Sequence, residues 1–432
     1  MTQPIPLDEF GIYLRRQGPR LKSLDIRFLR HTPTAVTRFS LTGPPPPFFF
    51  SCVCPWYRKT LSRLQPATMK ASSIATALAG GITMLSAAVQ ADPGMMNSSV
   101  LEVLHEADRR PQELIGDLQW LQPRQMSPVS HLIRSILVDG FDAQSNEHYQ
   151  YVPPLRSAAC ARDTCCVWWY IAKEMSQLFR GTDGQCTDAA RGAIRTGFHD
   201  AGAWSKTTGD FGGADGSIVH APEEMLRRPN KGLQEIVQQY KFWYDRWSHF
   251  GVSMADLIQM GANVATVVCP LGPRIRSFVG RRDNFKPAPD GLLPSPFDPP
   301  DKVIAMFRAK TIQPLSLAAL LGAHSTSRQR FFNPARAGAP QDSTPGVCDV
   351  LFYRQTLAAR SPPDVFRLPS DVVLAEHPLL FPAFKAFAGP GGQALWAHEY
   401  ARAYLRLSLL GVFNINNLTD CTRVLPPRTL KW

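Results

Sequence analysis

Residues 186–217 read CTDAARGAIRTGFHDAGAWSKTTGDFGGADGS and are the most informative part of this 432-residue chain. The first half is typical of a helix, because Thr187 is a suitable N-cap, alanines fill the body and Gly202 follows soon after the end. Arg195 and His199 stand four residues apart, so both are expected on one helix face. A permanent cation beside a titratable imidazole suits acid–base work on a small polar substrate.

The second half of this segment is rich in glycine and in oxygen donors. Asp200 directly follows His199, and the loop over residues 213–217 carries Asp215 and Ser217. Hard oxygens that alternate in a glycine-rich loop favour calcium over zinc or copper. By itself, R-x-x-F-H-D also fits an ordinary helix with a core histidine and a surface Arg–Asp pair. A second, independent signal is therefore needed.

Three motifs in the C-terminal half supply that signal. Residues 320–325 read LLGAHS, residues 342–349 read DSTPGVCD, and residues 367–371 read RLPSD. In this order, and together with residues 186–217, they resemble the plant-type haem peroxidase superfamily, most closely its secreted fungal class II (ligninase-like) branch. The resemblance extends from about Cys160 to Cys421.

The resemblance implies a mainly α fold: an all-helical haem peroxidase of about ten helices, with haem between a distal and a proximal half, long loops and two calcium sites. The residue pattern agrees, since few strand signals follow Cys160. Helices are expected over residues 167–178, 188–200, 233–250, 254–268, 316–324, 372–387 and 393–410. Ser253 and Asp256 resemble a capping box with Asp in place of Glu.

On the distal side, the resemblance implies that His199 is the acid–base. It would move a proton between the two oxygens of hydrogen peroxide, so that water leaves. Arg195 would stabilise the charge that develops as the O–O bond breaks. A base needs its other ring nitrogen fixed by an acceptor, and the family places Asn230 there, supported by Glu224. Phe198 is expected to pack over the haem.

On the proximal side, the resemblance makes His324 the axial ligand of haem iron. Asp371 would accept a hydrogen bond from the other nitrogen of that imidazole and make it more basic. The alternative for Asp371 is a structural aspartate that caps the next helix, and both roles can hold together.

Two calcium ions follow from the resemblance together with oxygen chemistry. The distal ligands would be Asp200, the Gly213 carbonyl, Asp215 and Ser217. The proximal ligands would be Ser325, Asp342, Thr344, the Val347 carbonyl and Asp349. Because each set adjoins a histidine of the site, loss of either ion is expected to disturb the haem pocket.

Nine cysteines are present, and none forms a C-x-x-C pair, which disfavours a zinc site. The sequence alone leaves the pairing open. The resemblance implies disulfides Cys160–Cys166, Cys165–Cys421 and Cys186–Cys269, which would require an oxidising compartment. Cys348 is left over and is expected to be a buried spectator.

The front of the chain lacks this chemistry. Residues 1–68 are rich in Arg and Pro and are expected to be a non-native or disordered leader. Residues 69–91 are typical of a secretory signal peptide, which favours translation from Met69 and a secreted protein; a genuine extension is the alternative and would make export doubtful. Residues 92–155, with a helix over 100–109, are expected to be an N-terminal extension or pro-segment, and residues 156–432 the peroxidase domain.

The net charge is +12, of which +7 lies in residues 1–68. No nucleic-acid-binding motif and no basic run accompany it, so nucleic acid is not an expected partner. The apolar run of the signal peptide is too short for a membrane helix. The expected partners are hydrogen peroxide and small phenolic or aromatic donors, for a monomer. Asn97 and Asn417 begin glycosylation sequons.

Departures from the family pattern bear on the donor. Manganese-oxidising relatives present three carboxylates where this chain has Asp188, Gly192 and Arg330, and lignin-oxidising relatives carry a surface tryptophan where it has Ala319. What remains is one-electron oxidation of small phenols while peroxide is reduced to water. A catalytically inactive haem- and calcium-binding protein is the alternative. A hydrolase that uses His199 and Asp200 is disfavoured, since no nucleophile or metal triad accompanies them.

Overall fold

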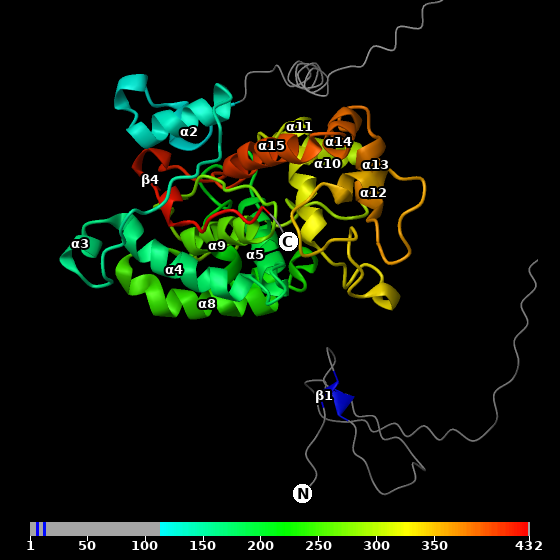
Figure 1. Ribbon diagram of the computed structural model, residues 1–432, viewed down its shortest axis with the longest axis horizontal. Coiled ribbons are helices and arrows are strands. Elements are labelled where there is room, and N and C mark those ends of the chain that lie inside the picture. Colours follow the sequence, from blue (N-terminus) through cyan, green and yellow to red (C-terminus); the bar gives the residue numbers. More distant parts are fainter. Residues whose placement is uncertain (1–5, 8–11, 14–112, 431–432) are drawn as a thin grey trace, which may run out of the picture. The chain divides into compact units, whose positions relative to one another are not determined.

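The computed structural model describes residues 6–7, 12–13 and 113–430 (Figure 1). The chain divides into two compact units, Met1–Leu85 and Ser86–Trp432. In the first unit, the described residues form an antiparallel pair of strands, β1 (Pro6–Leu7) and β2 (Ile12–Tyr13). The rest of the expected leader, the signal peptide and the helix over 100–109 lie outside the described residues.

The described part of the second unit is mainly α-helical, as predicted, and its helices gather in two groups (Figure 1). The first group is α3 (Ala158–Ala161), α4 (Thr164–Phe179), α5 (Asp188–Ala201), α8 (Gln234–Trp247) and α9 (Met254–Val268), with the short α6 (Ser217–His220) and α7 (Pro222–Met225). The second group is α10 (Pro300–Ala309), α11 (Pro314–Leu321), α12 (Leu351–Leu357), α13 (Pro369–Glu376), α14 (Phe381–Ala388) and α15 (Gly392–Leu407). The short strands β3 (Phe278–Val279) and β4 (Thr419–Asp420) pair antiparallel, Phe278 opposite Asp420.

Helix α9 is the centre of the first group, and all of its residues are buried. Helix α5 packs against it and comes close enough to exclude a side chain at Gly197. A Cβ at Gly197 would lie 2.2 Å from Tyr404 Oη and 2.7 Å from Ala262 Cβ. This close approach fixes the rotation of α5, and with it the direction in which Arg195 and His199 project.

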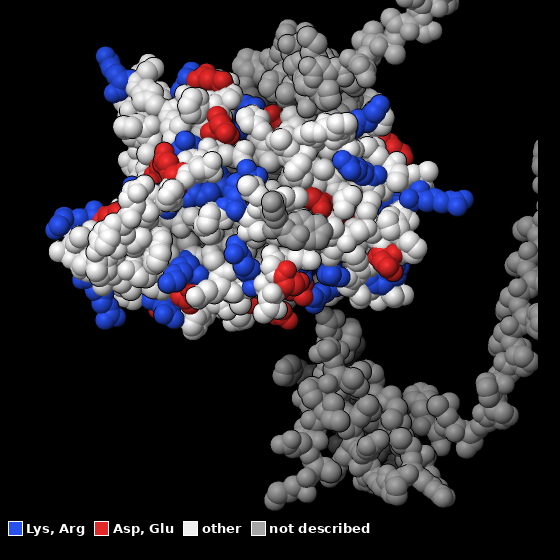
Figure 2. Space-filling model, in the orientation of Figure 1, with Lys and Arg blue, Asp and Glu red and all other residues white. Residues whose placement is uncertain are grey.

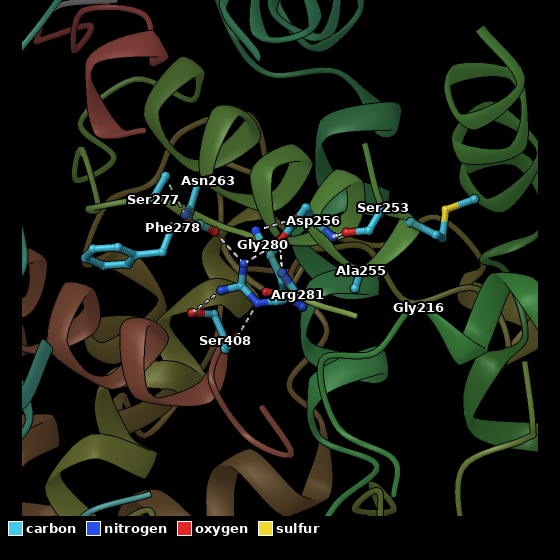
Figure 3. A network of polar contacts seen from close by, with 12 residues as sticks. Gly216, Ser253, Ala255, Asp256, Asn263, Ser277, Phe278, Gly280, Arg281 and Ser408 are labelled. Carbon is cyan, nitrogen blue, oxygen red and sulfur yellow. Dashed lines mark hydrogen bonds and ion pairs between the residues drawn. The ribbon is translucent and has the colours of Figure 1, made fainter. Parts of the chain in front are cut away.

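A buried ion pair ties α9 to the C-terminal end of α15 (Figure 3). Arg281 Nη1 lies 2.9 Å from Asp256 Oδ1, and Arg281 Nε donates to the Ser408 carbonyl at 2.9 Å. Ser253 caps α9 by accepting from the Asp256 amide, but the Asp256 carboxylate turns to Arg281 and to the Gly280 amide. The expected capping box therefore forms in one direction only, because the buried guanidinium competes for the carboxylate.

Several expected helices end at other residues in the structure: those over 233–250 and 393–410 end at Trp247 and Leu407, and two more differ in kind. The helix predicted over 316–324 ends at Leu321, and His324 lies on the 3₁₀ turn η5 (Gly322–Thr326). The helix predicted over 372–387 is two helices, α13 and α14, with Pro378 in the break. Proline lacks an amide donor and clashes with the preceding turn, so a helix does not run through it.

Residues 113–155 pack into the second unit. They contain α2 (Pro128–Val138), and their buried apolar side chains include Ile115, Leu118, Ile133, Ile136 and Leu137. Buried Arg406 on α15 donates from Nη1 to the Glu113 carbonyl at 2.8 Å and from Nη2 to the Leu137 carbonyl at 3.3 Å. The compact unit thus extends ahead of residue 156, where the domain was expected to begin.

Three disulfides have the pairing that the resemblance implied: Cys160–Cys166, Cys165–Cys421 and Cys186–Cys269. Cys348 is a buried free thiol.

Within the described residues, no helix has the length and apolar character needed to cross a bilayer. On the face that Figure 2 shows, basic and acidic side chains are interspersed among neutral ones.

Candidate active site

Helix α5 holds Arg195 and His199 side by side, as its spacing predicts. Arg195 Nε donates to His199 Nε2 at 3.3 Å. Its two other nitrogens donate to backbone carbonyls, Nη1 to Lys231 at 2.9 Å and Nη2 to Pro229 at 2.6 Å. These two anchors fix the guanidinium, and sequence reasoning missed them because a backbone carbonyl leaves no residue-type signal.

The second ring nitrogen of His199 is held by Asn230. His199 Nδ1 lies 2.8 Å from Asn230 Oδ1, while Asn230 Nδ2 donates to the Glu224 carbonyl at 2.8 Å. That second bond orients the amide with its oxygen toward the imidazole, so Nδ1 carries the proton and Nε2 is the basic nitrogen. Burial, then the charge of Arg195, lowers the pKa of His199 to about 3. The imidazole is therefore a neutral base at ordinary pH.

Glu224 supports Asn230 through its backbone carbonyl. Its carboxylate instead accepts from the Ala288 amide at 2.7 Å and lies 3.5 Å from Arg227. Burial raises the pKa of Glu224. The side chain thus ties the loop before α10 to the distal residues. A small cavity lies beside Asn230 and Pro229, and its lining also includes Ala203, Arg227 and Leu293.

On the opposite side, His324 and Asp371 form the expected pair. His324 Nδ1 lies 2.9 Å from Asp371 Oδ2. Burial acts against the charged imidazole, but the Asp371 carboxylate outweighs it and the pKa of His324 is raised. Asp371 lies in the first turn of α13 without capping it, since Leu368 occupies the N-cap position with no side-chain bond. The capping alternative is therefore not formed.

Aromatic side chains hold the C-terminal end of α11 through hydrogen bonds to its carbonyls, and this positions His324. Trp396 Nε1 donates to the Ala319 carbonyl at 3.0 Å, and Tyr353 Oη donates to the Ala318 carbonyl at 2.7 Å. The Phe352 ring meets the His324 imidazole edge to face at 5.6 Å. Sequence reasoning missed these three aromatic side chains, which lie 28 or more residues beyond the histidine.

The distal and proximal groups lie near each other. Helix α5 contacts η5, and the charges of His324 and His199 are close enough to interact. The His324 side chain keeps 32% of its surface accessible, and Phe198 and Ala323 are also partly accessible. Phe198 stacks on Phe307 at 6.0 Å. Two neighbouring imidazoles, one of them held by a buried carboxylate, stand beside partly accessible apolar side chains, and this set of residues fits a planar iron cofactor.

The structure brings the four expected distal calcium ligands together. Asp200 Oδ2 accepts from the Gly216 amide, and Asp215 Oδ1 accepts from the Ser217 amide at 3.0 Å. The Gly213 carbonyl accepts from the Asp215 amide. Within the described residues, buried Asp200 Oδ1 has no hydrogen-bond partner. Burial, then the charges of Asp215 and Glu224, raises the pKa of Asp200. This set fits a cation.

The five expected proximal ligands also meet. Ser325 Oγ lies 2.7 Å from Asp342 Oδ2 and 3.1 Å from the Val347 carbonyl, and Thr344 Oγ1 lies 2.8 Å from Asp349 Oδ2. Burial, opposed by Ser325 and reinforced by Asp349, raises the pKa of Asp342 to about 7. Among the described residues, no three Asp, Glu, His or Cys side chains form a metal-binding cluster. Each expected calcium site has two carboxylates and completes its ligands with hydroxyl and carbonyl oxygens.

A helical fold that places an arginine–histidine pair near a carboxylate-bound histidine defines the haem peroxidase class of oxidoreductase. The family model described as Peroxidase matches residues 171–389. Ligninase C of Trametes versicolor is 34% identical over 287 residues, which cover 61% of this chain and 75% of that protein. Ligninase LG5 of Phanerodontia chrysosporium is 34% identical over 285 residues, with the same shares. Peroxidase of Arthromyces ramosus is 31% identical over 284 residues, covering 61% and 76%.

The chain therefore belongs to the peroxidase family. Membership of that family implies haem and calcium in general terms. The family match begins after residues 113–155, so the segment that packs on α15 lies outside it.

Proposed function

We propose that this protein is a secreted peroxidase that reduces hydrogen peroxide to water and oxidises small phenols in one-electron steps. In each cycle one peroxide molecule takes up two electrons and two protons and becomes two water molecules. Two phenol molecules each give up one electron and the hydroxyl proton and leave as phenoxyl radicals. The observation that carries the proposal is the pair of contacts of His199, Nδ1 with Asn230 Oδ1 and Nε2 with Arg195 Nε, which makes Nε2 the basic nitrogen.

The residues of this chain have separate tasks in that reaction. His324 would hold haem iron through Nε2, and the bound haem would supply the redox chemistry. His199 Nε2 takes a proton from one oxygen of hydrogen peroxide and delivers it to the other, so the leaving group departs as water. Arg195, anchored by two carbonyls, stabilises the negative charge that develops meanwhile. Asp371 keeps the His324 imidazole oriented and electron-rich.

The alternative is a protein that keeps the fold and binds haem and calcium without turnover. Such a protein has no need for a guanidinium and an imidazole held in one fixed geometry on the distal side. The anchoring of Arg195 and the Asn230 contact to His199 therefore favour catalysis.

The test is an absorbance spectrum of haem-loaded protein expressed from Met69, taken before and after one equivalent of hydrogen peroxide. We expect a Soret band that shifts with peroxide and returns when a phenol is added. His199→Leu should slow the reaction with peroxide by about a hundredfold or more. His249→Gln changes an exposed histidine and is the matched control. A Soret band that does not respond to peroxide in the unmodified protein would support the binding alternative.

A further inference from the structure

Residues 330–332, with the sequence RFF, form a rim beside the distal side of the site. Phe331 lies over Gly232, which has a φ of +86° and so favours glycine. A Cβ built at Gly232 would be 2.7 Å from Phe331 Cε2 and 3.5 Å from Arg195 Nη1. The Phe331 ring edge and the distal guanidinium are therefore neighbours. The ring is nonetheless 57% exposed, so one surface of it is open to solvent.

A second exposed ring, that of Phe297, lies beside the rim. Phe332 stacks on Phe297, with ring centroids 4.8 Å apart and an angle of 22° between the planes. Phe297 is 61% exposed, and the Arg228 guanidinium lies 5.7 Å from its ring centroid. Phe331 and Phe297 are thus two exposed phenyl rings linked through Phe332, and a planar aromatic molecule can stack on them.

The charge beside these rings is positive. Arg330 Nη2 lies 3.5 Å from Asp188 Oδ2, and Arg191 Nη2 lies 2.6 Å from Asp188 Oδ1. Arg328 is also close enough to act on Asp188, whose pKa is lowered because these arginines outweigh the effect of burial. Three guanidinium groups thus surround one carboxylate and leave an excess of positive charge. The Arg330 side chain is 53% exposed and can reach a ligand.

We propose that the rim, together with the neighbouring Arg328 and Phe297, binds aromatic donors that carry a carboxylate or sulfonate group. The inference rests on the proposed peroxidase function and names its preferred class of donor. The ring of the donor would lie on the exposed phenyl surface, and its anion would face the guanidinium groups. A divalent cation does not fit, because the single carboxylate is already shared by arginines.

The redox step leaves the anionic group intact. A phenolic carboxylate loses one electron and its phenolic proton and becomes a phenoxyl radical that still carries the carboxylate. Hydrogen peroxide accepts the electrons, two from each pair of donors, as in the proposed function. The rim contributes binding and orientation only, so its residues are positioning residues for the donor.

The experiment compares 4-hydroxycinnamate with its neutral methyl ester in the haem-loaded protein. We expect the unmodified protein to favour the carboxylate in kcat/KM, and this preference should decline as salt is added. Arg330→Gln and Arg328→Gln should each lower the carboxylate-to-ester ratio by up to about fivefold, the upper end of the range for one exposed ion pair. Arg246→Gln removes an exposed arginine on α8 and should leave the ratio unchanged.

Binding is measured separately, without peroxide, by NMR line broadening of 4-methoxycinnamate and its methyl ester. Arg330→Gln should weaken binding of the carboxylate relative to the ester by a similar factor. Equal turnover and equal binding of the two compounds would overturn the inference while leaving the peroxidase function intact. Selective binding of the carboxylate without turnover of either phenol would instead overturn the proposed function and keep the anion site.

Discussion

The proton chemistry of the distal side depends on one amide group, that of Asn230. Its oxygen accepts a hydrogen bond from the Nδ1–H of His199 because its nitrogen is held by the Glu224 carbonyl. Asn230→Ala removes this acceptor, so His199 can take the tautomer in which Nε2 is protonated and cannot act as a base. We expect the rate constant for reaction with peroxide to fall by about tenfold to a hundredfold in stopped-flow measurements. Asn230→Asp keeps an acceptor oxygen and is the matched variant. An unchanged rate constant for peroxide in Asn230→Ala would show that Asn230 does not set the tautomer of His199.

Lys310 makes the stability of the fold, and not its catalysis, depend on pH. Its side chain is fully buried, and Nζ has no hydrogen-bond partner among the described residues. Burial lowers the pKa of Lys310 from 10.5 to about 8. Between these two values the unfolded chain binds a proton that the folded chain does not, so stability rises with pH across that window. Below about pH 8 the fold carries a buried charge.

Lys310→Met should therefore stabilise the protein at pH 7 by up to about 3 kcal/mol. The gain should shrink as pH rises from about 8 and be largely lost near 10.5. Denaturant unfolding at a series of pH values measures it. Lys173→Met removes an exposed lysine on α4 and should show no such trend. A gain that is independent of pH would mean that apolar packing, and not removal of a buried charge, is responsible.

At the scale of helices, the sequence was sufficient where local chemistry decides the structure. Helix α9 begins and ends at the predicted residues, and α5 carries Arg195 and His199 on one face. Local pattern could not place His324 on a 3₁₀ turn, because an apolar run before it looks the same in either helix type. The contact of Phe331 with Gly232 was also hidden, since it joins segments about a hundred residues apart and is made by a loop.

Of the two glycines in α5, Gly192 and Gly197, the second leaves less room for added volume. A methyl group there would overlap Tyr404 Oη and Ala262 Cβ, at 2.2 and 2.7 Å. Gly197→Ala should lower the free energy of unfolding by about 1–3 kcal/mol and displace the face that carries Arg195 and His199. Activity with peroxide should decline along with stability. Combining it with Tyr404→Phe removes the closest atom, so the double variant should lose less than the sum of the two single losses. Strict additivity in that cycle would contradict the steric explanation.

For the whole molecule, calcium is expected to couple the two sides of the site. Asp200 adjoins His199 and Ser325 adjoins His324, so each ligand set includes the neighbour of a site histidine. Without a cation, the buried carboxylates Asp200 and Asp215 repel each other, and protonation of either replaces the ion. Chelation should lower both the thermal unfolding midpoint and peroxide turnover, and added Ca²⁺ should restore both. Unchanged turnover after verified removal of calcium would contradict this coupling.

Residues 113–155 bear on how much of the chain the peroxidase domain needs in order to be stable. They are part of residues 92–155, which were expected to be an extension or pro-segment because they carry no recognisable chemistry. In the structure, α2 covers the core beside α15, and the carbonyls of Glu113 and Leu137 accept from buried Arg406. A chain that begins at residue 139 loses both acceptors and exposes the apolar residues beneath α2.

Each lost bond to a charged donor costs about 1.5–3 kcal/mol, so the chain that begins at residue 139 should lose at least about 3 kcal/mol of stability. A chain that begins at residue 113 keeps both carbonyls and is the control. Arg406→Met in the full chain separates the contribution of the hydrogen bonds to Arg406 from that of the apolar contacts of α2. It removes the buried charge and keeps α2 in place. Denaturant unfolding of the three proteins measures the differences. If the chain from residue 139 is as stable as the control, residues 113–138 are dispensable for the stability of the domain.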